Sequence, residues 1–220
     1  MNTKLERLVR LVEENPIAFE RYSRDVQQIN PLSRVYSIAT IINNLDIPKE
    51  STILDVGTGY GYGAVLLNAL GHTVIGIDFN GDKLRNGLEY WNKLGVDFKL
   101  GDSISQALGN EGKLYFSIKD SRNLEAIPKK SIDMITSFYI SGYMAGRKGA
   151  FRAVDGVLKP GGNLLVTTEG PIQVPSFLRG LAVSFASNFL RPEGLRLKSR
   201  FTIDDPFVYD KYVLIYERKR

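Results

Sequence analysis

The chain has 220 residues, 43% of them hydrophobic, which suits one ordinary globular domain with a buried core. It has no cysteine and one histidine, His72, which excludes a disulfide framework, a thiolate nucleophile and a zinc site of the usual ligands. The formal net charge of +5 favours anionic partners only weakly, because the basic residues are not interleaved with an aromatic platform.

The first 48 residues are expected to form a helical extension. Leu5, Val9 and Val12 belong to one apolar stripe, prolines divide the segment, and residues 31–46 repeat apolar side chains at helical spacing. We expect these helices to cover a ligand pocket, or else to form a dimer contact. Candidates for pocket contacts, each with a surface role as the alternative, are Tyr22, Arg24, Arg34 and Tyr36. Residues 1–7 lack the apolar core of a signal peptide and no apolar run suits a membrane helix, so a cytoplasmic protein is expected.

A glycine-rich loop follows the first predicted strand. Ile53, Leu54 and Val56 indicate a buried parallel strand, glycines alternate from position 57 to 63, and residues 64–70 have helical composition. Such a loop lets a ligand approach the backbone, and the next helix points free N–H groups at the same space. The following strand ends at Asp78, about 20 residues after the glycines, where a carboxylate can accept both ribose hydroxyls. The pattern predicts a nucleoside pocket.

Asp55 bears on which nucleoside binds. A carboxylate two positions ahead of the first glycine would repel a diphosphate, but it could accept a hydrogen bond from an ammonium group of a cationic ligand. The spacing Gly59-x-Gly61-x-x-Ala64 also fits the looser dinucleotide pattern, so a nicotinamide-binding fold stays open, as does a glycine-rich turn without a ligand.

The rest of the chain alternates predicted helices and strands. A helix buries Leu84, Leu88 and Trp91, with Trp91 expected in the core. Strands are predicted over residues 113–119 and 132–139, a Pro-Gly-Gly turn at 160–162 leads into another, and residues 96–102 alternate like a strand. Residues 171–195 read as a largely apolar helix, and two final strands around 201–203 and 212–216 suit an antiparallel hairpin.

Two motifs resemble the class I S-adenosylmethionine-dependent methyltransferases. One is Asp55-x-Gly57-x-Gly59-x-Gly61 with Asp78; the other is the Leu-x-Pro-Gly-Gly turn at residues 158–162. The resemblance spans about residues 50–218 and implies an α/β three-layer sandwich with a mostly parallel seven-stranded sheet that ends in an antiparallel hairpin. It divides the chain into an N-terminal helical extension over the cofactor pocket, 1–48, and a methyltransferase-like domain, 49–220.

The same resemblance implies a set of residues around S-adenosylmethionine. An acid after the third strand should lie near adenine, and Asp120 with Ser121 is preferred to Asp102 because Leu124 and the Ile-Pro pair at 127–128 follow it as in the family. Residues 96–112 would then be an insertion or an extended helix end. The expected cofactor-binding residues are Asp55, Gly57, Thr58, Gly59, Tyr60, Gly61, Asp78, Phe79, Asp120, Ser121, Ser137 and Phe138.

The implied activity is transfer of a methyl group from S-adenosylmethionine by inline displacement, which leaves S-adenosylhomocysteine. The expected acceptor is a small molecule, with RNA or protein as alternatives, and no metal is expected. No residue must be a catalytic base. Tyr139, Tyr143 and Glu169 are expected at strand ends where a base could sit, with a hydrogen-bonding role in lining the site as the alternative for each. The alternatives are a non-catalytic subunit that binds RNA or protein through a basic surface, and a nicotinamide-dependent oxidoreductase.

Overall fold

The computed structural model describes residues 2–15, 31–101, 108, 112–138, 148–169, 194–203 and 211–219. Several candidates from the sequence lie outside these residues, as do residues 171–193 of the helix expected over 171–195; the expected end of that helix is wrong, because residue 195 begins a strand. The candidates are Tyr22, Arg24, Asp102, Tyr139 and Tyr143.

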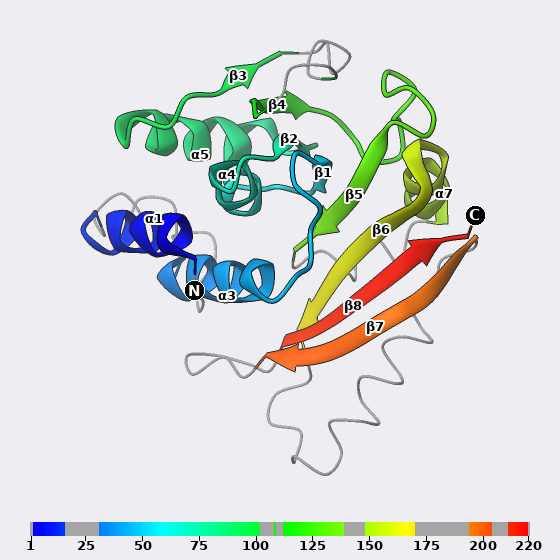
Figure 1. The fold of residues 1–220 in the computed structure, drawn as a ribbon. Helices are drawn as coiled ribbons and strands as arrows, with labels where there is room; N and C mark the ends of the chain where they lie inside the picture. Colours follow the sequence, from blue (N-terminus) through cyan, green and yellow to red (C-terminus); the bar gives the residue numbers. More distant parts are fainter. Residues whose placement is uncertain are drawn as a thin grey trace.

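A single mixed sheet organises the described part of the chain (Figure 1), in the strand order β3-β4-β2-β1-β5-β6-β8-β7. The pairs from β3 to β6 are parallel, whereas β8 pairs antiparallel with both β6 and β7, so the expected antiparallel ending is confirmed. The strands are β1 (Thr52–Val56), β2 (Thr73–Asp78), β3 (Lys99–Leu100), β4 (Leu114–Ile118), β5 (Ile132–Ser137), β6 (Leu158–Glu169), β7 (Leu195–Ile203) and β8 (Lys211–Arg218).

The expected count of seven strands is wrong, because the sheet has eight. The additional strand, β3, pairs Lys99 and Leu100 with β4 at the edge of the sheet. Both of its residues are exposed, so no buried apolar face shows which residues of the alternating segment pair. The alternation over 96–102 therefore corresponds to a strand of only two residues.

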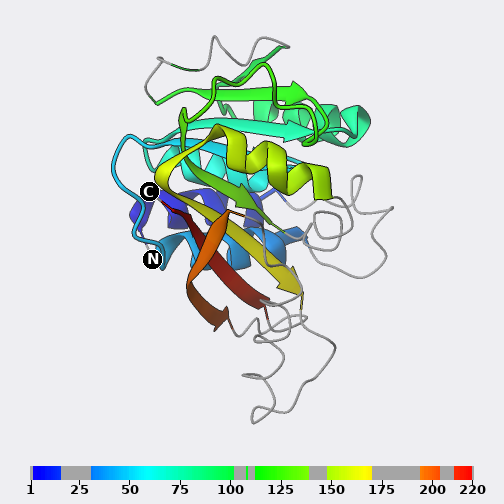
Figure 2. The ribbon, with the colours of Figure 1, turned by 90° about the vertical axis from the view of Figure 1, so that its right-hand side faces the viewer.

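Helices cover both faces of the sheet, as Figure 2 shows from the side. On one face, α4 (Tyr62–Ala69) and α5 (Gly81–Lys93) pack in the same core as α1 (Thr3–Glu13) and α3 (Pro31–Asn43). On the other face, α7 (Lys148–Val157) contributes Val154 and Val157 to a second core. The three-layer α/β architecture predicted from the sequence is confirmed.

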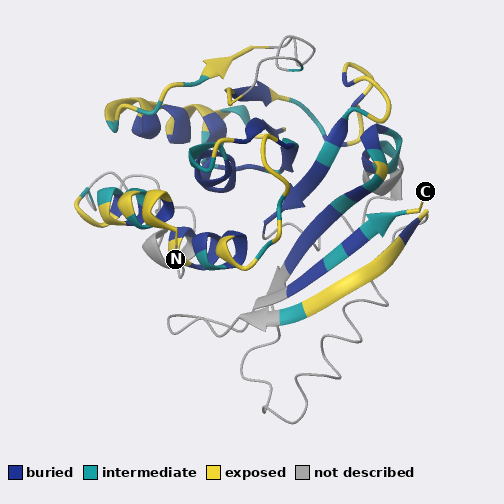
Figure 3. Ribbon diagram, viewed as in Figure 1, coloured by how far each residue is buried: buried dark blue, intermediate teal, exposed yellow. Residues whose placement is uncertain are grey.

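The N-terminal helices join the main core rather than forming a separate one. Leu5, Val9 and Val12 of α1 are buried with Ile38 of α3 and Leu66 of α4. The buried stripe of each helix faces inward and the polar side faces solvent (Figure 3), as expected of amphipathic helices. This packing holds α3 against α4, the helix that follows the glycine-rich loop.

The Pro-Gly-Gly segment interrupts pairing at the start of β6. Ile132 pairs with Leu158 and Met134 with Asn163, so one residue of β5 lies opposite four residues of β6. A Cβ on Gly162 would lie 2.9 Å from the carbonyl oxygen of Asp133, which explains the glycine there. The predicted turn therefore exists as a wide bulge at the amino end of the parallel strands.

The sheet brings the two motif carboxylates to the same edge. Parallel pairing sets Asp55 opposite Gly76 and Val56 opposite Ile77, so Asp55 and Asp78 end neighbouring strands. Ligands of open parallel sheets bind at this carboxyl edge. Among the described residues, no helix has the length and apolar character that crossing a bilayer requires.

Candidate functional site

The glycine-rich loop between β1 and α4 folds back onto the end of β2. The amides of Gly57 and Thr58 both donate to the carbonyl oxygen of Ile77, at 2.8 and 3.0 Å. The amide of Gly59 donates to Asp78 Oδ2 at 2.8 Å. Gly59 and Gly61 have φ of 58° and 83°, which side-chain-bearing residues rarely adopt. The backbone of the loop is thus fixed by β2 before any ligand binds.

Asp55 lies buried beneath this loop, with only 1% of its surface exposed. Thr136 Oγ1 of β5 donates to Asp55 Oδ1 at 2.8 Å, and the amide of Ala64 in the first turn of α4 also donates to the carboxylate. A Cβ on Gly63 would lie 3.1 Å from Asp55 Oδ2 and 2.6 Å from the Phe138 ring. Gly63 therefore lets the carboxylate occupy the helix N-terminus, where dinucleotide folds hold a phosphate.

The buried environment of Asp55 disfavours its ionised form. Burial raises the pKa of Asp55 to about 6, and the nearby Asp78 adds to the rise, while hydrogen bonds from Thr136 and the amide of Ala64 oppose it. In the described part of the chain no basic side chain forms an ion pair with Asp55. Neutral dipoles hold the carboxylate, and a cationic ligand would stabilise its ionised form.

Asp78 accepts two backbone amides at the end of β2 and lines a cavity there. Its Oδ2 accepts from the amide of Gly59, and its Oδ1 accepts from the amide of Asn80, both at 2.8 Å. Each carboxylate oxygen keeps further acceptor capacity, so the same group can receive two ligand hydroxyls. Asp78 lines a cavity of about 160 Å³ together with Phe79 and Ser121.

A second, smaller cavity of about 70 Å³ lies on the other side of the loop. It is lined by Asp55, by Phe138 and by Ile38 of α3. Gly57 and Lys83 line both cavities, so the two cavities adjoin at the loop and are together called the hollow below; Asp55 lines one of them and Asp78 the other. Ile38 was not among the residues expected from the sequence, because its apolar side chain does not differ from its core neighbours on α3.

Helix α5 supports the loop from behind. A Cβ on Gly87 would lie 2.4 Å from the carbonyl oxygen of Tyr60, so only glycine allows the helix to approach this closely. Trp91 Nε1 donates to that same oxygen at 2.8 Å. Sequence reasoning placed Trp91 in the core, which is correct, but missed its bond to the loop. Gly87, a glycine inside an otherwise amphipathic helix, was the sequence feature that could have indicated this close contact between α5 and the loop.

The remaining expected residues fall in several places. The carboxylate of Asp120 binds the Arg122 side chain at 2.5 to 2.9 Å and does not line either cavity, whereas its neighbour Ser121 does. Ser137 is fully buried at the end of β5. Tyr36 is 42% exposed on α3 and lines neither cavity.

The polar groups of the hollow suit S-adenosylmethionine better than a dinucleotide. Because the amides of Gly57, Thr58 and Gly59 bind protein acceptors, they are not directed at a diphosphate. The hydroxyl of Ser121 is buried in the larger cavity with no hydrogen-bond partner in the structure, and could bind an adenine or ribose group. Two carboxylates favour a ligand with ribose hydroxyls and a positive charge.

Comparison with known proteins agrees with this chemistry. A family model described as "Methyltransferase domain" matches residues 54–166, just over half of the chain. A search of curated protein sequences finds no match.

Solved structures give the same fold. A SAM-dependent methyltransferase from Aquifex aeolicus is 18% identical with a TM-score of 0.58, covering 83% of this chain and 90% of that one. A chain from the Haloferax volcanii complex of the Trm112 methyltransferase activator with a methyltransferase is 16% identical, with a TM-score of 0.62. The match covers 93% of this chain and 97% of that one. The [4+2]-cyclase SpnF is 15% identical, with a TM-score of 0.61. The match covers 84% of this chain and 80% of that one. S-adenosylmethionine is the cofactor that the family match implies, and the chain belongs to the class I S-adenosylmethionine-dependent methyltransferases.

Proposed function

We propose that this protein is an active methyltransferase that transfers the methyl group of S-adenosylmethionine to a small-molecule acceptor. The observation that supports it most is the convergence of Asp55 and Asp78 on one hollow, each held by its own hydrogen bonds. Likeness of fold alone would not suffice, since SpnF has the same fold and its name describes a cyclase.

The two cavities divide the cofactor between them. Asp78 receives the ribose hydroxyls, and Phe79, which is 60% exposed beside the larger cavity, offers an aromatic face to adenine with Ser121 nearby. The methionine moiety then extends past Gly57 toward Asp55. There its positive charge is stabilised by a carboxylate that has no basic partner in the described chain.

The residues around the smaller cavity would align the reacting groups. When bound, the cofactor supplies a methyl on a sulfonium, so that an acceptor lone pair bonds to carbon as the carbon–sulfur bond breaks and neutral S-adenosylhomocysteine forms. Alignment is the main contribution that such a reaction needs from the protein. Ile38, Tyr62 and Phe138 supply an apolar wall that holds a reactant in place and excludes water.

This wall also bears on the acceptor. Ile38 and Phe138 present hydrocarbon rather than positive charge, which favours a small, partly apolar acceptor over a nucleic-acid backbone. A base is required only if the acceptor must lose a proton, which is then taken up by that base or by solvent.

The test is methyl transfer from tritium-labelled S-adenosylmethionine to a cell extract separated into metabolites, RNA and protein. We expect label in the metabolite fraction with the wild type, and none with Asp78→Ala. Label in RNA or protein would confirm the enzyme and overturn the small-molecule acceptor. Binding of the cofactor without transfer to any fraction would favour a non-catalytic subunit.

A further inference from the structure

A cavity of about 470 Å³ lies at the amino end of the parallel strands, away from the glycine-rich loop. Its walls include residues 44–48 after α3, the Pro-Gly-Gly bulge of β6, and Lys198 and Phe201 of β7. Met134 of β5 also lines it, whereas Phe138, four residues further along, lines the smaller cavity of the hollow. Four extended residues span roughly 13 Å. Because methyl transfer requires contact at roughly 3 Å, a ligand in this amino-end cavity cannot be the methyl acceptor.

Two irregularities of the sheet border the amino-end cavity. One is the Pro-Gly-Gly bulge; the other lies in β7, where the pairing with β8 shifts between Leu197 and Ser199, so that Lys198 is an extra residue. A bulge of this kind redirects a side chain. Lys198 Nζ donates at 3.3 Å to Oδ1 of Asn163, the residue that follows the Pro-Gly-Gly bulge. The two bulges thus meet at the wall of the cavity, since Lys198 and Asn163 both line it.

Lys198 keeps hydrogen-bonding capacity for a ligand. The other lysine of the lining, Lys159, pairs with Asp133 at 2.6 Å. The acid that Lys198 contacts is Glu217, whose carboxylate oxygen lies 3.8 Å away, beyond hydrogen-bond distance. Arg196 binds that same carboxylate at 2.6 Å. An ammonium group has three donors, and the bond between the two bulges uses one of them, so the others can bind an anionic group.

Asp46 supplies the opposite charge. It is exposed on the segment after α3, and it forms no ion pair with any residue that the structure describes. The lining also contains half-buried apolar side chains, namely Leu45, Ile47, Phe201 and Ile215. The amino-end cavity therefore offers a cation, an anion and an apolar surface to one ligand.

We propose that the amino-end cavity binds a small zwitterion with an apolar body, such as a free amino acid with a hydrocarbon side chain. Lys198 binds the carboxylate, Asp46 binds the ammonium group, and Phe201 packs against the hydrocarbon. A ligand without net charge matches a lining in which two lysines balance two aspartates. The volume falls in the range of about 300–1,000 Å³ that is typical of small-molecule pockets. This site is additional to methyl transfer and is filled independently of the cofactor.

The test is calorimetry on the full chain with leucine as the probe, in saturating S-adenosylhomocysteine so that leucine cannot enter the hollow. Two comparison ligands each lack one charge: 4-methylpentanoate has no ammonium group, and 3-methylbutylamine has no carboxylate. We expect saturable binding of leucine, and binding about fivefold weaker for each comparison ligand, as for exposed charge pairs.

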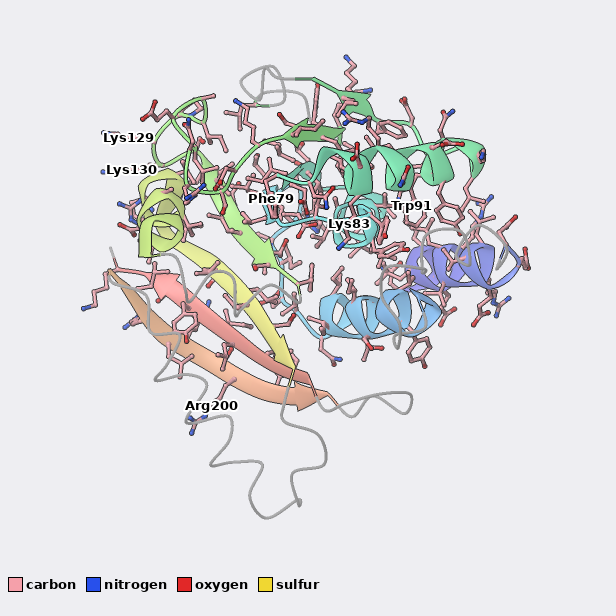
Figure 4. All side chains as sticks on the ribbon, turned by 180° about the vertical axis from the view of Figure 1, so that it is seen from behind. Phe79, Lys83, Trp91, Lys129, Lys130 and Arg200 are labelled. Atoms are coloured by element: carbon pink, nitrogen blue, oxygen red, sulfur yellow. The ribbon has the colours of Figure 1, made fainter. Side chains whose placement is uncertain are left out.

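Two variants assign the charges to residues. Lys198→Met should weaken leucine and 4-methylpentanoate about fivefold and leave 3-methylbutylamine unchanged. Asp46→Asn should weaken leucine and 3-methylbutylamine by a similar factor and leave 4-methylpentanoate unchanged. Arg200→Met is the matched control, because Arg200 is a basic residue of the same strand that does not line the cavity. Figure 4 shows its side chain extending outward from β7, and its loss should change no affinity.

The proposal is overturned if leucine shows no saturable binding up to about 10 mM, or if its affinity responds to neither Lys198→Met nor Asp46→Asn. Equal weakening of all three ligands by either variant would overturn it too, because that variant would then only distort the cavity. None of these results depends on methyl transfer. A protein that binds leucine as expected but not S-adenosylhomocysteine would refute the cofactor assignment and leave this site standing, since the variants locate it.

Discussion

Two aspartates at opposite ends of the parallel strands show how the same side chain is used for structure and for binding. Asp133, at the amino end of β5, accepts from Lys159 Nζ at 2.6 Å and from the amide of Thr52 at 2.9 Å. Asp55, at the carboxyl end of β1, accepts from a hydroxyl and an amide but has no cationic partner in the described chain. The charge of Asp133 is neutralised within the protein, whereas no basic side chain of the described residues neutralises that of Asp55.

The cavities at these two ends reinforce the contrast. The hollow at the amino end measures about 470 Å³ and is lined by Asp133, Lys159 and the Pro-Gly-Gly bulge. The two cavities at the glycine-rich loop measure about 70 and 160 Å³. The larger hollow is the less informative one, because its ion pair is complete. The unmatched charge, rather than the volume, supports the proposal that the cofactor binds at the glycine-rich loop.

The largest effect is expected from Asp78→Ala. It removes two charge-assisted bonds to the ribose and two acceptors for the amides of Gly59 and Asn80. We expect affinity for S-adenosylhomocysteine to fall about a thousandfold, or about 4 kcal/mol. Asp133→Ala, the matched change at the other end, should lower the melting temperature but leave affinity within about twofold. Calorimetry measures the affinity of each variant and thermal melts measure its stability. If Asp78→Ala and Asp133→Ala lost similar affinity, the carboxyl end of the strands would not be the binding end.

A smaller effect is expected from the titration of Asp55: rising pH should lower the stability of the protein but raise its affinity for the cofactor. Its pKa in the folded protein is about 6, above the ordinary 3.8, so its protonated form is the one that folding favours. The wild type should therefore lose stability relative to Asp55→Asn as pH rises from 4 to 7.5, by about 2 kcal/mol. Urea denaturation at several pH values measures this difference.

Cofactor affinity should show the reverse trend, since the cationic ligand needs ionised Asp55. Wild-type affinity should fall as pH drops through about 6, and Asp55→Asn should remove this dependence. A wild type and variant with parallel pH profiles, for both stability and binding, would show that Asp55 titrates as an ordinary surface acid.

The smallest effect compares two glycines inside helices. Gly87 of α5 is in contact with the loop, whereas nothing lies within 4 Å of a Cβ on Gly156 of α7. We expect Gly87→Ala to displace the Tyr60 carbonyl and weaken cofactor binding about tenfold, or about 1.4 kcal/mol. Gly156→Ala should raise stability by up to about 1 kcal/mol without affecting binding. Equal responses of the two variants would show that α5 does not position the loop.

The sequence predicted the parts of the molecule that depend on local pattern. The strand, loop and helix from 52 to 70 and the position of Asp78 were correct, because strand ends in a parallel sheet converge whatever surrounds them. The antiparallel ending was also correct, because both final strands are rich in β-branched and aromatic residues.

What the sequence could not predict depends on how helices pack. Lys83, Gly87 and Trp91 meet the loop only because of the angle at which α5 crosses it, and no spacing along the chain encodes that angle. The alternation over 96–102 indicated a strand, but it could not show that only Lys99 and Leu100 pair, because both residues of β3 are exposed. The role of Asp120 near adenine stays a prediction, since its carboxylate binds Arg122 and only Ser121 lines the cavity.

The most direct measurement is calorimetric titration of the wild-type chain, in parallel, with S-adenosylmethionine and with NAD. A carboxylate at the N-terminus of α4 and loop amides bonded to β2 should favour the sulfonium and exclude the diphosphate. We therefore predict saturable binding of S-adenosylmethionine and no heat with NAD. Binding of NAD without binding of S-adenosylmethionine would contradict the account.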